Sequence, residues 1–155
     1  CGYLGDPQRE CTCTDGEIRR YGQKISGPLL DRIDLHVSVM RPKYSELTAT
    51  IQGEPSCDIA KRVAEARAVQ AERLSRWHMQ SNAQMGHRQL KETCQLDAEG
   101  TEMLRVVFEK LHLSARSYDR IIKVARTIAD LAGSDQIRPE HVAEAISFRN
   151  MINGK

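Results

Sequence analysis

One arginine of this chain stands in a setting suited to phosphoryl chemistry. Arg32 lies between Asp31 and Asp34 in the stretch Ser26-Gly-Pro-Leu-Leu-Asp-Arg-Ile-Asp-Leu-His-Val37. A guanidinium keeps its charge at any working pH and offers a rigid fork of donors, so it can stabilise the charge on a transferring phosphoryl group. The alternative is a surface arginine that pairs with one of the two aspartates. Composition alone favours that alternative.

A second arginine is expected near the start of a long helix. Ser114 can cap this helix, which places Arg116 in its first turn. Arg120 and Lys123 follow four and seven residues later, so the three basic side chains share one helical face. Most such faces are simply solvated. Arg120, Lys123 and Arg126, further along the same helix, are expected to be ordinary surface charges or subunit-contact residues.

Three cysteines near the start of the sequence have a spacing that allows a metal site. Cys1 and the pair Cys11-Thr12-Cys13 could supply thiolates to a tetrahedral zinc ion. A Cys-x-Cys pair without a second complete pair is a weak signal, and free thiols are the alternative. The chain holds five cysteines, an odd number. This count argues against a secreted disulfide scaffold and favours a reduced, cytoplasmic protein.

The elements that precede the long helices are expected to be few and short. A short helix is expected within residues 17–24. Residues 33–40 are the one strand candidate, because their apolar side chains alternate with polar ones. Residues 41–55 contain two prolines and a glycine and indicate a linker.

From residue 56 onward the pattern predicts four or five helices that form a small bundle capable of folding alone. Ser56, Asp97 and Ser114 can cap three of them, Gly133 is expected just past the third, and Pro139 near the start of the last. A shorter helix is expected near residues 87–93. The expected core follows the helical spacing of the apolar residues: Met103, Leu104, Val107, Phe108, Tyr118, Ile121, Ile122, Ala125, Ile128 and Ile146.

The composition is that of an ordinary globular protein and argues against a membrane protein or a secreted protein. Charged residues make up 28% and hydrophobic residues 40% of the chain. A net charge of +2 is too small to argue for nucleic-acid binding by itself. No apolar run approaches the length of a membrane span, and no secretory signal is evident. We therefore expect no membrane partner.

Several motifs together resemble one family of ATPases. The segment from Gly27 to Leu35 resembles the arginine-finger segment of AAA+ ATPases related to magnesium chelatases and MCM helicases. Four further motifs make the chain similar to the magnesium-chelatase-like competence proteins of bacteria, the ComM type: Cys1-Gly-Tyr-Leu-Gly, Cys11-Thr-Cys13, Arg20-Tyr-Gly-Gln-Lys-Ile-Ser26 and Leu113-Ser-Ala-Arg-Ser-Tyr-Asp-Arg120. The resemblance extends over nearly the whole chain.

The resemblance implies a role for each candidate residue. Arg32 matches the arginine finger, which acts in trans on ATP held by a neighbouring subunit. Arg116 matches the sensor-2 arginine, which contacts the terminal phosphate from the lid domain, and whether it acts in cis or in trans stays open. The family pattern also has a further cysteine two residues before Cys1, outside this chain, beside the three possible zinc ligands.

The resemblance also implies a division of the chain. Residues 1–40 would be the end of the α/β ATPase core, with one strand and otherwise loops. Residues 41–55 would be the linker, 56–150 the helical lid domain and 151–155 a tail. The expected fold class is therefore mainly α. The resemblance further implies that the chain is only the C-terminal third of a parent protein. The chain begins with Cys rather than Met, so we expect an excised fragment or a processed product and favour the excised fragment.

The expected function is that of one part of a motor. The sequence contains neither a Gly-x-x-x-x-Gly-Lys-Ser/Thr phosphate loop nor an acidic Walker-B-like strand, so this chain alone should not hydrolyse ATP. The resemblance implies a parent that uses ATP and Mg²⁺ in a homo-oligomeric ring, expected to be a hexamer, and moves DNA as a helicase or branch-migration motor. No cofactor is expected on the fragment itself. The alternatives are the ATPase subunit of a magnesium-porphyrin chelatase and a helical adaptor for a partner protein.

Overall fold

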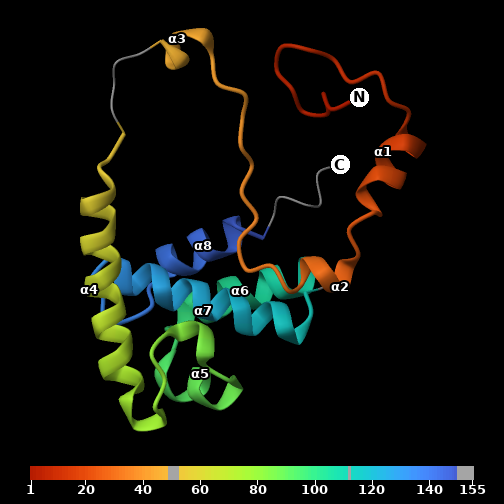
Figure 1. Ribbon diagram of the computed structural model, residues 1–155. Coiled ribbons are helices and arrows are strands. Elements are labelled where there is room, and N and C mark those ends of the chain that lie inside the picture. Colours follow the sequence, from red (N-terminus) through yellow and green to blue (C-terminus); the bar gives the residue numbers. More distant parts are fainter. Residues whose placement is uncertain (49–52, 112, 150–155) are drawn as a thin grey trace. The chain divides into compact units, whose positions relative to one another are not determined.

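In the computed structural model, residues 1–48, 53–111 and 113–149 are described, and the chain divides into two compact units (Figure 1). The first, the N-terminal unit, comprises Cys1–Ile33 with Val37–Ile51. The second, the helical unit, comprises Asp34–His36 with Gln52–Lys155. No described helix combines the length and the apolar character that crossing a lipid bilayer requires.

The N-terminal unit contains three short helices: α1 (Asp15–Gly22), α2 (Gly27–Leu30) and α3 (Tyr44–Leu47). Thr14 begins α1 through a capping box, in which its hydroxyl accepts the N–H of Glu17 and the Glu17 carboxylate accepts the N–H of Thr14. Helix α1 thus starts two residues before the predicted range. The described part of the predicted linker contains α3. None of residues 1–48 whose burial is described is buried, so this unit has no core among them.

The strand predicted for residues 33–40 is not formed, which corrects that part of the predicted fold class. No described residue pairs with this segment in a ladder. Instead, His36 donates its backbone N–H to the carbonyl of Phe148 at 2.9 Å. An isolated strand cannot satisfy its backbone groups. The alternating pattern therefore yields only an irregular segment, which is exposed except at the half-buried His36.

The helical unit contains the predicted bundle (Figure 1). Its elements are α4 (Ser56–Leu74), η1 (Ser75–Trp77), η2 (Asn82–Gln84), α5 (His87–Thr93), α6 (Ala98–Lys110), α7 (Ala115–Leu131) and α8 (Pro139–Ser147). Two predicted caps are confirmed, because Asp97 accepts the N–H of Gly100 at 2.7 Å and Ser114 accepts the N–H of Ser117 at 3.1 Å. The cap predicted at Ser56 is wrong, since Ser56 is already helical and Pro55 holds the cap position without a side-chain bond.

Helix α7 is the centre of the helical unit. It packs against α4, α5, η2 and α8, and α6 packs against α8 (Figure 1). Half of the predicted core is buried: Leu104, Ile121, Ile122, Ala125 and Ile146. Four other predicted members are partly buried against that core: Met103, Val107, Tyr118 and Ile128. Phe108 is half-buried, and its ring meets the Tyr118 ring edge-on, with centroids 6.1 Å apart.

A buried charge cluster joins α4, α7 and η2. The Asp130 carboxylate accepts two hydrogen bonds from the Arg73 guanidinium, at 2.8 and 2.7 Å, and one from the Asn82 amide at 2.8 Å. Arg126 Nε donates to the same carboxylate at 3.0 Å, and its other nitrogens donate to carbonyls of the loop after α7. The prediction that Arg126 is a surface charge is therefore wrong, since the residue is only 2% exposed.

Candidate functional site

Arg116 is positioned by the start of α7. The hydroxyl of Ser114 caps the helix, and Arg116 is its second residue, with an exposed side chain. Among the described residues, none forms a hydrogen bond or ion pair with the Arg116 guanidinium. The positive end of the helix dipole lies at the same corner. This corner of the helical unit is therefore suited to an anion.

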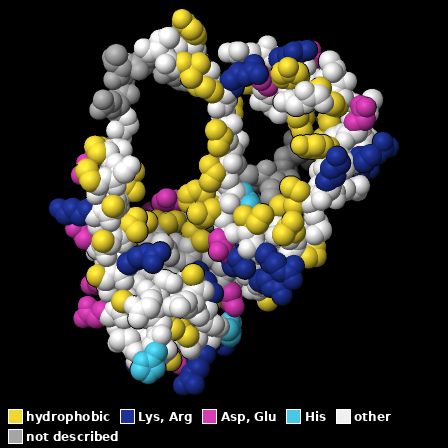
Figure 2. All heavy atoms as spheres, viewed as in Figure 1, with side chains coloured by type: hydrophobic (Ala, Val, Ile, Leu, Met, Phe, Trp, Pro, Cys, Tyr) yellow, Lys and Arg dark blue, Asp and Glu magenta, His cyan; other side chains and the backbone are white. Residues whose placement is uncertain are grey.

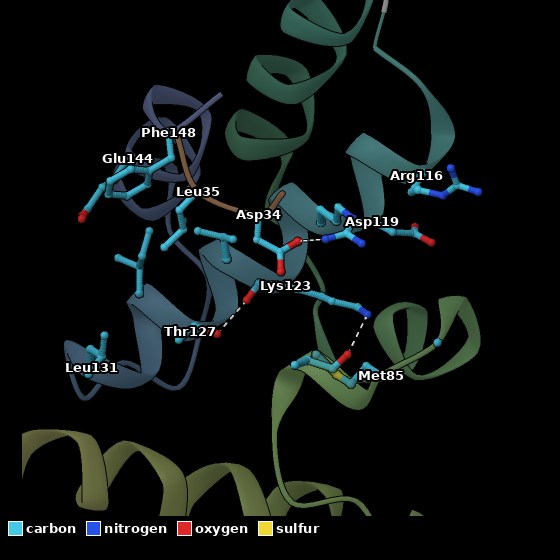
Figure 3. A pocket seen from close by; sticks show the side chains of 15 residues that line it. Asp34, Leu35, Met85, Arg116, Asp119, Lys123, Thr127, Leu131, Glu144 and Phe148 are labelled. Atoms are coloured by element: carbon cyan, nitrogen blue, oxygen red, sulfur yellow. Dashed lines mark hydrogen bonds and ion pairs between the residues drawn. The ribbon is translucent and has the colours of Figure 1, made fainter. Parts of the chain in front are cut away.

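A pocket of about 680 Å³ runs along one face of α7 (Figure 3). That face presents Arg116, Arg120, Lys123, Thr127 and Leu131, as the predicted spacing requires. Figure 3 shows Arg116 at one end of the pocket, with its side chain directed away from the other end. The chain around residues 83–86, the segment 34–35 and the end of α8 complete the walls.

The three basic residues on this face differ in their partners. Lys123 Nζ donates to the carbonyl of Ala83 at 3.1 Å, which holds that loop to α7. Arg120 forms an ion pair with Asp34. Only Arg116 lacks a protein partner among the residues that the structure describes. Of the three, Arg116 is thus the one available to a ligand.

A second hollow, of about 650 Å³, also borders Arg116. Phe108 and Tyr118 give it an apolar wall, and Asp119 and His87 stand at its edge. The Asp119 carboxylate and Nδ1 of the His87 ring lie 3.0 Å apart, within hydrogen-bond distance. Arg116 therefore borders two concave surfaces. The pocket along α7 has polar and apolar walls, and the second hollow is mainly apolar.

Arg32 lies in the N-terminal unit, two residues after the end of α2. Its side chain is exposed, and Nη1 donates to the carbonyl of Pro28 at 3.1 Å. The sequence left open a pairing of Arg32 with Asp34, but Asp34 instead binds Arg120, 86 residues away. No local pattern reveals so distant a partner, so the sequence reasoning missed the pair of Asp34 and Arg120.

The three N-terminal cysteines are brought together. The Sγ atoms of Cys1, Cys11 and Cys13 all lie within 4.8 Å of one another, and the Cys1 and Cys11 sulfurs are 3.5 Å apart. Zinc–thiolate bonds of about 2.3 Å in a tetrahedron separate the sulfurs by about 3.8 Å. The cluster therefore fits three thiolate ligands of a zinc ion and leaves one position for a fourth ligand. Cys57 and Cys94 lie elsewhere in the sequence and belong to no such group among the described residues.

The helical unit has the mainly α architecture of a C-terminal helical lid region. The chain belongs to the magnesium chelatase family. Residues 53–149 match the family "Magnesium chelatase, subunit ChlI C-terminal", and residues 1–47 match "Magnesium chelatase, subunit ChlI". The two matches are separated by residues 48–52, which lie within the predicted linker.

Individual relatives confirm the resemblance to the ComM type. Competence protein ComM of Haemophilus influenzae is 38% identical over 137 residues, which are 88% of this chain and 26% of that protein. The uncharacterized protein YifB of Escherichia coli is 36% identical over 148 residues, which are 95% of this chain and 28% of that protein. The chain thus spans little more than a quarter of the length of these curated relatives.

Proposed function

We propose that this chain supplies two arginines to ATP hydrolysis in a longer AAA+ ATPase of the magnesium chelatase family. Arg116 is the sensor-2 arginine and binds the terminal phosphate of ATP from the lid. The observation that carries this proposal is its exposed guanidinium at the capped start of α7, which no described residue engages. A phosphate at that place meets both the guanidinium and the positive end of the helix.

Arg32 is the arginine finger of the proposal and acts on ATP held by a neighbouring subunit. It stabilises the negative charge on the transferring phosphoryl group, a contribution worth about 10³–10⁵ in rate. Mg²⁺ that accompanies the nucleotide neutralises further phosphate charge. Because this sequence has no phosphate loop, the residues that cradle the nucleotide come from another part of the parent.

The cysteine cluster is proposed to hold zinc as a structural ion. Cys1, Cys11 and Cys13 supply three thiolates, and the geometry of their sulfurs supports this assignment. A bound ion would cross-link the loops of the N-terminal unit, whose described residues form no core.

We propose DNA as the polymer that the parent moves, in a ring of identical subunits, with six as the expected number. Support comes from the 38% identity to a competence protein. On the face in Figure 2, Lys and Arg side chains mix with Asp and Glu and form no continuous basic surface. The proposal therefore assigns DNA contact to the assembled ring rather than to that face. Porphyrin metallation is the second candidate, which the family's description favours.

The experiment compares ATP turnover by the full-length gene product and three variants. Arg32→Ala should lower kcat by about 10³-fold or more. Arg116→Ala should lower kcat/KM by about 10–100-fold, the value of one charged hydrogen bond. Arg88→Ala is the control, because Arg88 is an exposed arginine paired with Glu92 on α5. Turnover that survives both Arg32→Ala and Arg116→Ala would contradict the proposal.

A further inference from the structure

We propose that Asp34 and Arg120 form a positioning pair, which fixes the chain just after the arginine finger to the sensor helix α7. The inference rests on the proposed function, because it concerns how Arg32 and Arg116 act together. Neither Asp34 nor Arg120 is assigned to touch the nucleotide.

Three consecutive residues of the helical unit, Asp34–His36, contact α7 and the end of α8. Asp34 accepts a hydrogen bond from Arg120 on α7. Figure 3 shows the Asp34 carboxylate with a dashed line to this bond's donor. Leu35 lines the apolar part of the same pocket, where Phe148 also lies. His36 donates its backbone N–H to the Phe148 carbonyl at 2.9 Å. The attachment therefore combines an ion pair, an apolar side chain in the pocket and a backbone hydrogen bond.

Asp34 and Arg120 each lie close in the sequence to one of the two arginines proposed to contact ATP. Asp34 follows Arg32 by two residues, a stretch that reaches at most about 7 Å when extended. Arg120 follows Arg116 by four residues, one turn of the same helix. The ion pair thus links a point beside one proposed ATP-contacting arginine to a point beside the other.

The pair suits positioning better than stabilisation. The side chain of Arg120 is 25% exposed and that of Asp34 is 55% exposed. Ion pairs this open contribute little to folding stability. Because residues 34–36 join no strand ladder with any described residue, the orientation of this segment depends on the contacts named above. When a phosphate draws Arg116, α7 carries Arg120 and therefore Asp34 with it.

The first test measures hydrogen exchange of the His36 backbone amide in this chain. Asp34→Asn and Arg120→Gln should each speed this exchange about ten-fold, because the segment loses its anchor on α7. The double variant Asp34→Arg with Arg120→Asp should return it toward the wild-type rate. Arg88→Gln, which breaks the comparable exposed pair with Glu92, should leave it unchanged. Unchanged exchange in both single variants would overturn the attachment.

The second test measures ATP turnover by the full-length gene product. Arg120→Gln should lower kcat about ten-fold and leave KM for ATP within about two-fold, because a displaced finger weakens only the transition state. Arg120→Lys should recover part of the loss, and the charge-swapped double variant should recover more. If Arg120→Gln fails to fold, Asp34→Asn carries the same test.

The two proposals fail in different ways. If Arg32→Ala abolishes turnover while Arg120→Gln and Asp34→Asn leave kcat unchanged, the positioning role is overturned and the proposed function stands. If Arg32→Ala leaves turnover intact, the proposed function falls and the positioning role falls with it. The exchange rate of the His36 amide still shows in that case whether the attachment exists.

Discussion

Arg126 and Asp130 lie one helical turn apart on α7 and form an ion pair of 2.9 Å with side chains only 2% and 0% exposed. Arg73 of α4 places a second guanidinium on the same carboxylate at 2.7 Å. One buried carboxylate therefore serves two arginines. The cluster fastens the C-terminal half of α7 to α4, while Arg116 remains exposed at the opposite end of the helix.

Replacing Asp130 by Asn should destabilise the helical unit strongly. The variant leaves two guanidinium groups without their shared carboxylate, and breaking a buried pair costs about 3–5 kcal/mol. Denaturant unfolding measures the loss, with Arg88→Gln as a surface control that should change stability by less than about 0.5 kcal/mol. A loss for Asp130→Asn as small as that of the control would show that the cluster contributes nothing.

The same carboxylate predicts how stability depends on pH. Burial alone would raise the pKa of Asp130, but hydrogen bonds from Arg73 and Asn82 and the charge of Arg126 hold the pKa below its ordinary value. A carboxyl with a depressed folded pKa stabilises the protein above its unfolded pKa, near 4, and loses that contribution as the pH falls through the folded pKa.

The free energy of unfolding should therefore fall as the pH is lowered below about 4. In Asp130→Asn this fall should be smaller, because the titrating group is gone. Denaturant unfolding at a series of pH values measures both slopes. Equal slopes in the two proteins would contradict the assignment to Asp130.

Ile122 tests the packing of the lid. It is 6% exposed on α7, whereas Ile59 on α4 is 41% exposed. Ile122→Ala should cost about 2–5 kcal/mol, because it removes buried methyl groups and leaves a cavity. Ile59→Ala is the matched control and should cost much less. A loss below about 0.5 kcal/mol for Ile122→Ala would place that side chain at the surface.

Gly133 tests the end of α7. Its φ of +65° lies in the left-handed region, and no described atom lies within 4 Å of the Cβ that a substitution would add. Gly133→Ala should therefore cost about 1–2 kcal/mol of stability through backbone strain alone. Gly133→Asn should cost less, since asparagine tolerates this conformation better. Equal losses for the two variants would point to a cause other than the backbone.

The cysteine cluster predicts stoichiometric metal binding. Titration with Co²⁺ should give a thiolate charge-transfer band at one ion per chain, and added Zn²⁺ should displace it. Cys11→Ser or Cys13→Ser should abolish the band, whereas Cys57→Ser should retain it, because Cys57 lies outside the cluster. A band that survives Cys11→Ser and Cys13→Ser would contradict the site.

The sequence predicted best what depends on neighbouring residues. The caps at Asp97 and Ser114 and the apolar stripe of α7 follow from spacing, so the later helices were predictable. The strand at 33–40 was not, because a strand depends on partners that a local pattern cannot supply. Arg126 was misassigned although Asp130, four residues later, was a signal for a pair. The contact of Asp34 with Arg120 joins distant parts of the chain and could not be predicted from either segment alone.

The most direct test of the account is ATP turnover by the full-length gene product, measured without DNA and with single-stranded or double-stranded DNA. If the protein is an ATP-driven DNA motor, DNA should raise turnover several-fold, and Arg32→Ala should abolish the increase. An ATP turnover rate that neither form of DNA changes would contradict the motor assignment and favour a chelatase-type or adaptor function.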